Sequence, residues 1–215
     1  MRSRSPFLFL VLSVMMTIAY ADALDDGMTA FEAFEYKKAE KLLRPLATQG
    51  EAVAQVAVGI MYASGLGELK RDSTEALQWF LTAAEQGNVE AGFFLGELYG
   101  TAQPGLQINH AEAVKWYRWA AEQGHINAQY KLGSRYFKGG EGLPMDYVAA
   151  FAWMDVAARQ GHYSAPESCN MIAMILNPEE LAKAKALADD LAEKYIAKET
   201  RDERFKQFYQ ISVKK

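Results

Sequence analysis

The sequence has a single cysteine, Cys169, so no disulfide can form within the chain and core packing has to stabilise the fold. It also lacks an excess of Lys and Arg: its 23 basic residues are outnumbered by 27 acidic ones, and the net charge is −4. No strongly basic cluster stands out along the chain. Affinity for nucleic acid depends on basic side chains that neutralise phosphates. We therefore expect no nucleic-acid partner.

Residue patterns typical of catalysis are also missing. Zinc needs three or four converging ligands, whereas His110 shares no ligand spacing with His125 and His162, which we expect in solvent-facing turns. The apolar neighbours of Cys169 predict a buried, inert thiol. The glycine-containing segment 140–144 lacks the Lys-Ser/Thr continuation of a phosphate-binding loop. We predict no catalytic residue, no metal site and no cofactor, and hence no enzyme.

One long apolar run is present, at residues 7–18. Two arginines precede it, small residues follow it, and it is shorter than the roughly 20 residues of a membrane span. These features predict a signal peptide at residues 1–21, with cleavage after Ala21 or, alternatively, after Ala23. Removal of the two arginines would take the net charge from −4 to −6. We expect a periplasmic or secreted protein that is not embedded in a membrane after cleavage.

The dominant feature of the rest of the chain is a repeat of 37 residues. The pair Gln-Gly occurs at residues 49–50, 86–87, 123–124 and 160–161. The same spacing connects further columns, which are Ala54, Ala91, Ala128 and Ala165, then Gly59, Gly96 and Gly133, then Tyr62, Tyr99 and Tyr136, and then Trp79, Trp116 and Trp153. Such regularity is the mark of a tandem-repeat protein.

Each repeat has the pattern of two helices. Ala128, Leu132 and Tyr136 share one face of a first helix, and Gly133 within it predicts a helix crossing that has no room for a Cβ. A short acceptor side chain precedes the second helix of each repeat and suits an N-cap. These predicted caps are Asp72, Asn109 and Asp146.

The fold class that follows is all-α, a right-handed α/α solenoid of helix pairs with a period of 37 residues. A C-terminal capping helix, opened by Asn177 and Pro178, is expected to close the stack. The predicted parts are a signal peptide (1–21), an N-terminal helical half repeat (22–50), the repeats (51–176), the capping helix (177–198) and a charged tail (199–215).

The segment AQYKLGSRYFKGGEGLPMDYVAAFAWMDVAARQG resembles the Sel-one-like repeat family, a relative of the tetratricopeptide repeats. The resemblance covers roughly residues 25 to 197, and its entry and exit segments are similar to those of bacterial exported members. It implies an adaptor or assembly factor without chemistry of its own. We therefore expect an exported scaffold that mediates protein–protein interaction in the cell envelope. The alternative is a factor that binds peptidoglycan or glycan, or that modulates an envelope enzyme.

If the helices stack as in tetratricopeptide repeats, the first helix of each repeat lines a concave face. Aromatic and methionine side chains among acids on that face suit a protein or peptide partner, with a cell-wall polymer as the alternative ligand. Packing of these side chains against the next helix is an equally open interpretation. The expected binding residues are Glu90, Phe93, Glu97, Asn127, Tyr130, Ser134, Phe137 and Met171.

Overall fold

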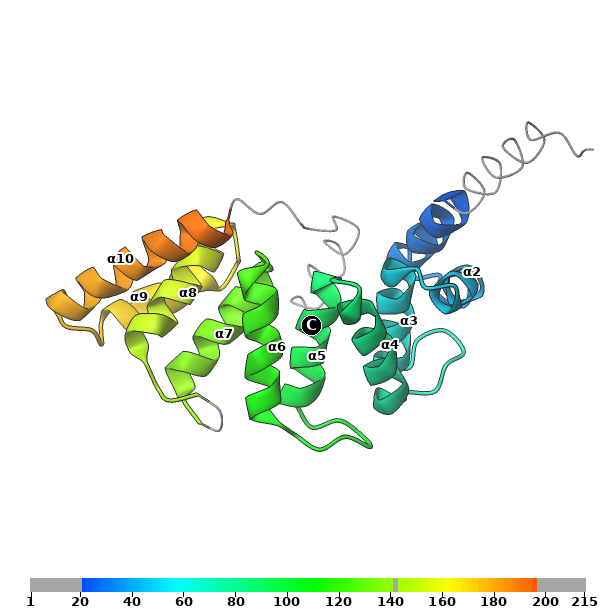
Figure 1. The fold of residues 1–215 in the computed structure, drawn as a ribbon, viewed down its shortest axis with the longest axis horizontal. Helices are drawn as coiled ribbons and strands as arrows, with labels where there is room; N and C mark the ends of the chain where they lie inside the picture. The colour runs from blue at the N-terminus through cyan, green and yellow to red at the C-terminus, as the bar shows by residue number, and fades with distance from the viewer. Residues whose placement is uncertain (1–20, 141–142, 197–215) are drawn as a thin grey trace, which may run out of the picture. The chain divides into compact units, whose positions relative to one another are not determined.

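A computed structural model describes residues 21–140 and 143–196, and it divides them into an N-terminal unit (21–83) and a C-terminal unit (84–196). Apart from isolated β-bridges, the regular structure of these residues is helical (Figure 1). Residues 1–20 of the predicted signal peptide and the whole predicted charged tail lie outside the described residues.

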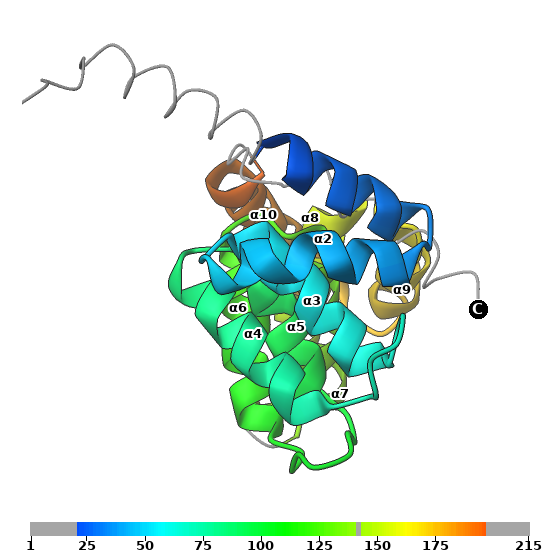
Figure 2. The ribbon, with the colours of Figure 1, turned by 90° about the vertical axis from the view of Figure 1, so that its right-hand side faces the viewer.

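The N-terminal unit contains a helix at residues 21–32 and three further helices, α2 (Tyr36–Thr48), α3 (Ala52–Ser64) and α4 (Ser73–Glu85), in which the unit boundary falls (Figure 2). Every residue from Val53 to Met61 of α3 is buried. A Cβ added to Gly59 of α3 would lie 2.6 Å from the ring of Phe80 in α4. The glycine therefore allows these two helices to approach closely.

The C-terminal unit continues with helix pairs. Its helices are α5 (Val89–Gly100), α6 (His110–Glu122), α7 (Ile126–Lys138), α8 (Tyr147–Arg159), α9 (Ala165–Ala173) and α10 (Pro178–Tyr195) (Figure 1). Gly92 at the start of α5 faces Trp119 near the end of α6, whereas Gly96 faces Tyr117. The two helices of this pair therefore run antiparallel.

The recurring glycine of the first helix lies at a close crossing in both repeats of this unit. A Cβ added to Gly133 would lie 2.7 Å from Met154 Cγ and 3.0 Å from the carbonyl oxygen of Ala150. At the equivalent Gly96, it would lie 2.5 Å from the ring of Tyr117. The prediction that no Cβ fits at Gly133 is confirmed.

The predicted helix boundaries rest on local contacts that the structure contains. Asn109 Oδ1 accepts a hydrogen bond from the Glu112 amide at 3.0 Å, and Asp146 Oδ1 accepts one from the Ala149 amide at 2.9 Å. Asp72 caps α4 in the same way. The three predicted N-caps are therefore confirmed. The glycines of the Gln-Gly pairs all have positive φ, at 99° (Gly50), 85° (Gly87), 89° (Gly124) and 86° (Gly161).

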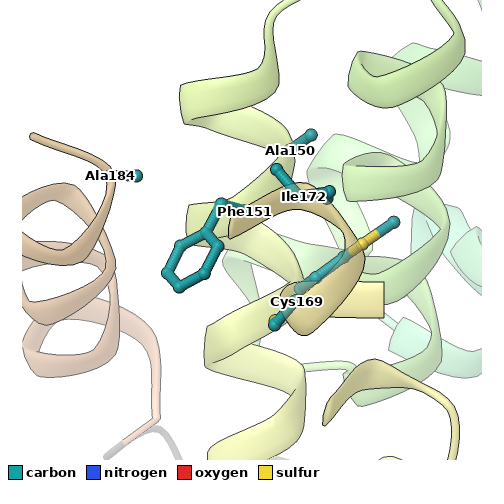
Figure 3. Close-up of a cluster of buried hydrophobic side chains, with 6 residues drawn as sticks. Ala150, Phe151, Cys169, Ile172 and Ala184 are labelled. Atoms are coloured by element: carbon teal, nitrogen blue, oxygen red, sulfur yellow. The ribbon is translucent and has the colours of Figure 1, made fainter. Parts of the chain in front are cut away.

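The last helices enclose a small core of their own. Asn177 opens α10 with a capping box, in which its side chain accepts a hydrogen bond from the Glu180 amide and the Glu180 carboxylate accepts one from the Asn177 amide. Figure 3 shows side chains of α8, α9 and α10 that meet beneath this helix. The buried members of this cluster are Ala150, Phe151, Met154, Cys169, Ile172 and Ala184.

Candidate protein-binding surface

Two of the expected binding residues lie in the interior. Only 4% of Glu90 and 6% of Phe93 is exposed, so neither side chain offers an open anchor to a partner. For these two residues the packing interpretation holds, and the interpretation as exposed groove residues was wrong. The reason is His125, whose side chain meets both of them.

His125 is buried, with 4% of the residue exposed, and the expectation of a solvent-facing turn was wrong. Its Nδ1 accepts a hydrogen bond from the Ala128 amide at 3.1 Å, so the imidazole is the N-cap of α7. The other ring nitrogen, Nε2, then carries the proton that it donates to Glu90 Oε2 at 2.9 Å. The ring also stacks on Phe93, with the centroids 4.6 Å apart. One histidine thus connects α5 to the start of α7.

A related pair occurs 37 residues later, between Tyr130 and His162. Their rings stack with centroids 4.1 Å apart, and the Tyr130 hydroxyl lies 3.3 Å from the Ser168 hydroxyl of α9. Burial, and secondarily the charge of Lys131, lowers the pKa of His162 to about 4. In both pairs the histidine follows its aromatic partner by 32 residues. This spacing is present in the sequence, but by itself it does not indicate that the two rings are in contact.

Glu97, another of the expected binding residues, belongs to a polar network. The Tyr117 hydroxyl donates to Glu97 Oε1 at 2.5 Å, and Lys131 Nζ lies 2.8 Å from the same oxygen. Burial, followed by the Glu97 carboxylate, raises the pKa of Tyr117. This glutamate is half-buried and already paired, so it is a weaker candidate for partner binding than the sequence suggests.

The remaining expected residues of α7 lie at the surface but are partly covered. Asn127, Ser134 and Phe137 are half-buried. The ring of Phe137 packs against the core cluster beneath α10 and lies 5.4 Å from the ring of Tyr147. These side chains can contribute polar and apolar edges to an interface, but no deep anchor.

The exposed large apolar side chains of this unit include Tyr163 and Met145, as well as a group at the end of α9 and just after it. In this group, Met171, Met174 and Ile175 are exposed by 50%, 88% and 49%, and their i, i+3, i+4 spacing brings them together. We call these three residues the α9 patch. Of these three, Met171 was among the expected binding residues. The exposure of Ile175 depends on where α9 ends, which the sequence pattern did not reveal.

No catalytic chemistry emerges from these residues. Burial, and secondarily Asp155, raises the pKa of the Cys169 thiol to about 12, so the sulfur stays protonated and unreactive near neutral pH. Within residues 21–140 and 143–196, no group of three or more His, Cys, Asp or Glu side chains could hold a metal ion. Over the same residues, no helix is long and apolar enough to cross a membrane.

Antiparallel helix pairs, a 37-residue period and glycine crossings define an α-helical repeat protein. The family model of the Sel1 repeat matches residues 52–88, 89–125 and 126–162, which together exceed half of the chain. The chain belongs to the Sel1 repeat family, which confirms the resemblance and the predicted fold class. Sel1 repeats generally mediate protein–protein interactions, and proteins of this family generally act as non-catalytic scaffolds.

Solved structures agree with this assignment. A Sel1 repeat protein from Oxalobacter formigenes is 34% identical, with a TM-score of 0.53, over 60% of this chain and 94% of that one. A protective antigen of uropathogenic Escherichia coli strains, which displays an SLR fold, is 24% identical, with a TM-score of 0.52, over 91% of this chain. The match spans 48%, about half, of that antigen's length. A search of curated proteins found no match.

Proposed function

We propose that this protein is an exported scaffold of the cell envelope that binds a protein partner through the α9 patch and the neighbouring surface of α7. The observation that carries the proposal is the exposure of three large apolar side chains at the C-terminal end of α9 and in the turn that follows it, Met171, Met174 and Ile175. Exposed apolar side chains grouped in this way are typical of interaction sites. Methionine suits such a site because its flexible thioether adapts to different partners.

The half-buried side chains of α7 extend this surface. Tyr130 connects α7 to α9 through the contact between its hydroxyl and that of Ser168. Beyond it, Ser134 and Phe137 occupy the next turns of α7. We expect the partner to present an apolar segment to the α9 patch and polar groups to the hydroxyls of α7. Export is supported by the signal-peptide pattern of the N-terminal sequence.

A photo-crosslinking amino acid at Met171 tests the surface. Its matched control is the same amino acid at Lys185, which is exposed on α10. A crosslink from position 171 to one defined polypeptide, absent at position 185, is the expected result. Equal crosslinking at both positions, or recovery only with the cell-wall sacculus, would contradict protein binding through this surface and favour the cell-wall alternative.

Substitution separates binding from folding. Met171→Asp and Met174→Asp should each weaken partner capture about tenfold, because a carboxylate then has to be desolvated against an apolar partner. Both side chains are exposed, so the thermal midpoint should stay unchanged. Intact-mass measurement on fractionated cells tests export, with a mature chain that begins at Asp22 outside the cytoplasm as the expected species.

A further inference from the structure

The N-terminal unit contains a surface pocket that the scaffold function does not use. It has a volume of about 610 Å³ and lies where the helix at residues 21–32 turns into α2. The pocket is shallow and largely open to solvent, so it suits a segment of chain lying on the surface rather than an enclosed small molecule. The lining residues are Phe34, Glu35, Tyr36, Lys37, Lys38, Lys41 and Gly67.

Phe34 holds its ring at this pocket in an unfavourable backbone conformation. Its φ is 62°, and among the described residues it is the one non-glycine residue with a positive φ. The Phe34 amide bonds to the Phe31 carbonyl and the Glu35 amide to the Ala30 carbonyl, which is a helix C-terminus where glycine is usual. A side chain there costs about 1–2 kcal/mol. Because 51% of Phe34 is exposed, the burial of the rest of its side chain offsets only part of this cost, about 1 kcal/mol.

The ring has a defined place in spite of this exposure. The rings of Phe34 and Tyr36 meet edge to face with centroids 5.9 Å apart, and Tyr36 in turn contacts the buried Phe31 at 5.6 Å. On the opposite wall, a Cβ added to Gly67 would lie 3.3 Å from the backbone of Tyr36. The pocket thus has two aromatic rings and a closely packed loop backbone as its rigid parts.

Three lysines provide the charge of the pocket. Lys37 pairs with Glu68 at 2.6 Å and Lys38 with Glu35 at 3.3 Å, and all four side chains are more than half exposed. Exposed pairs of this kind stabilise the fold by about 0–1 kcal/mol, so their ammonium groups are readily shared with a ligand. Lys41 lies one turn further along α2 and has no ion pair among the described residues. The three lysines face two glutamates, Glu35 and Glu68, so the site carries one net positive charge in a chain whose net charge is −4.

We propose that this pocket binds an acidic peptide segment that carries an apolar side chain. The apolar side chain lies against the rings of Phe34 and Tyr36, and neighbouring carboxylates pair with the lysines of α2. The exposed part of the Phe34 ring, at a position that favours glycine, is the surface that this apolar side chain covers. The site lies in the N-terminal unit, so its test is independent of the α9 patch.

Fluorescence anisotropy with the full chain tests the proposal. The probe is a fluorescein-labelled peptide of alternating glutamate and leucine, and it should bind with an affinity that falls as salt rises. A peptide with serine in place of leucine, and one with lysine in place of glutamate, should both bind about tenfold more weakly or not at all. Equal binding of the serine peptide would overturn the role of the rings, and absence of binding by the glutamate–leucine peptide would overturn the site.

Three variants separate ligand binding from folding. Phe34→Gly should weaken probe binding about tenfold, while the thermal midpoint stays equal or rises, because glycine removes the backbone strain. Lys41→Glu should weaken binding about fivefold, whereas Lys70→Glu, the same charge change on an exposed residue outside the pocket, should leave it unchanged. A lower midpoint for Phe34→Gly with unchanged probe affinity would assign the ring to folding alone and overturn the proposal.

Discussion

The two repeats of the C-terminal unit, 89–125 and 126–162, each end in a histidine that stacks on an aromatic ring, but the surroundings of the two histidines differ. In the first, His125 stacks on Phe93, caps α7 and donates to Glu90. In the second, His162 stacks on Tyr130, but its Nδ1 has no hydrogen-bond partner among the described residues. The first junction is closed and buried, whereas the second is only half-buried.

The difference follows from where the next helix begins. Helix α7 starts at Ile126, directly after His125, whereas α9 starts at Ala165, two residues later than the 37-residue period would place it. Pro166 explains the shift: it has no amide proton to donate to the His162 carbonyl, so it fits only in the first turn of the helix. The later start is one reason why α9 is shorter than α7. A single proline near the start of a helix can thus separate a buried repeat junction from a half-buried one.

The largest expected effect concerns the closed junction. His125→Ala removes the helix cap, the ring contact with Phe93 and the partner of the buried Glu90, and it should lower the free energy of unfolding by about 3 kcal/mol. His162→Ala should lower it far less. Urea unfolding measures both. The control His125→Asn keeps a cap, as Asn88 does for α5, and should fall between them. Equal losses at positions 125 and 162 would contradict the comparison.

The second largest loss of stability is expected at the closely packed glycine that both repeats contain. Gly96→Leu and Gly133→Leu should each lower the free energy of unfolding by about 1–3 kcal/mol or more, because the new side chain overlaps Tyr117 or the backbone of α8. Circular dichroism melts measure the loss. Ser134→Leu, beside Gly133 but at a half-buried position, is the matched control and should change the midpoint little. An unaltered melt for Gly133→Leu would mean that α7 has a different register.

The caps of the second helices should be equivalent in the two repeats. Asn109→Ala and Asp146→Ala each remove the acceptor for one amide at the start of α6 or α8, and each should lower the free energy of unfolding by about 1 kcal/mol. Asp146→Asn retains an acceptor and should be nearly neutral. Thermal melts of the three variants decide the matter. A loss at only one of the two caps would show that the repeats differ here as well.

The smallest effect is a pH dependence of the open junction. Burial lowers the pKa of His162 from 6.5 to about 4, so the unfolded chain takes up a proton first as the pH falls. This contribution to stability is present above pH 6.5 and is lost as the pH drops towards about 4. His162→Gln should therefore show a smaller decrease in Tm over that range than the wild type. Parallel Tm curves for the two proteins would mean that His162 is solvated in the folded state.

Sequence alone determined the repeat and most of its helix boundaries. Caps such as Asn109 and Asp146, and the glycine of each Gln-Gly pair, act on backbone groups a few residues away, so their effect is local and visible in the sequence. The close crossing at Gly133 was predictable for a related reason, since a glycine that recurs in mid-helix has few explanations other than packing.

Only the tertiary structure decided which side chains remain available to a partner. Phe93 and Tyr130 occupy equivalent positions, yet their exposure depends on histidines 32 residues further along the chain and on the start of the following helix. The exposed patch at Met171 likewise depends on the short α9, and the pocket at Phe34 on a loop that approaches from Gly67. The exposure of a side chain depends on all the neighbours that folding brings around it. Periodicity along one helix therefore identifies a face of that helix but does not determine which residues cover the face.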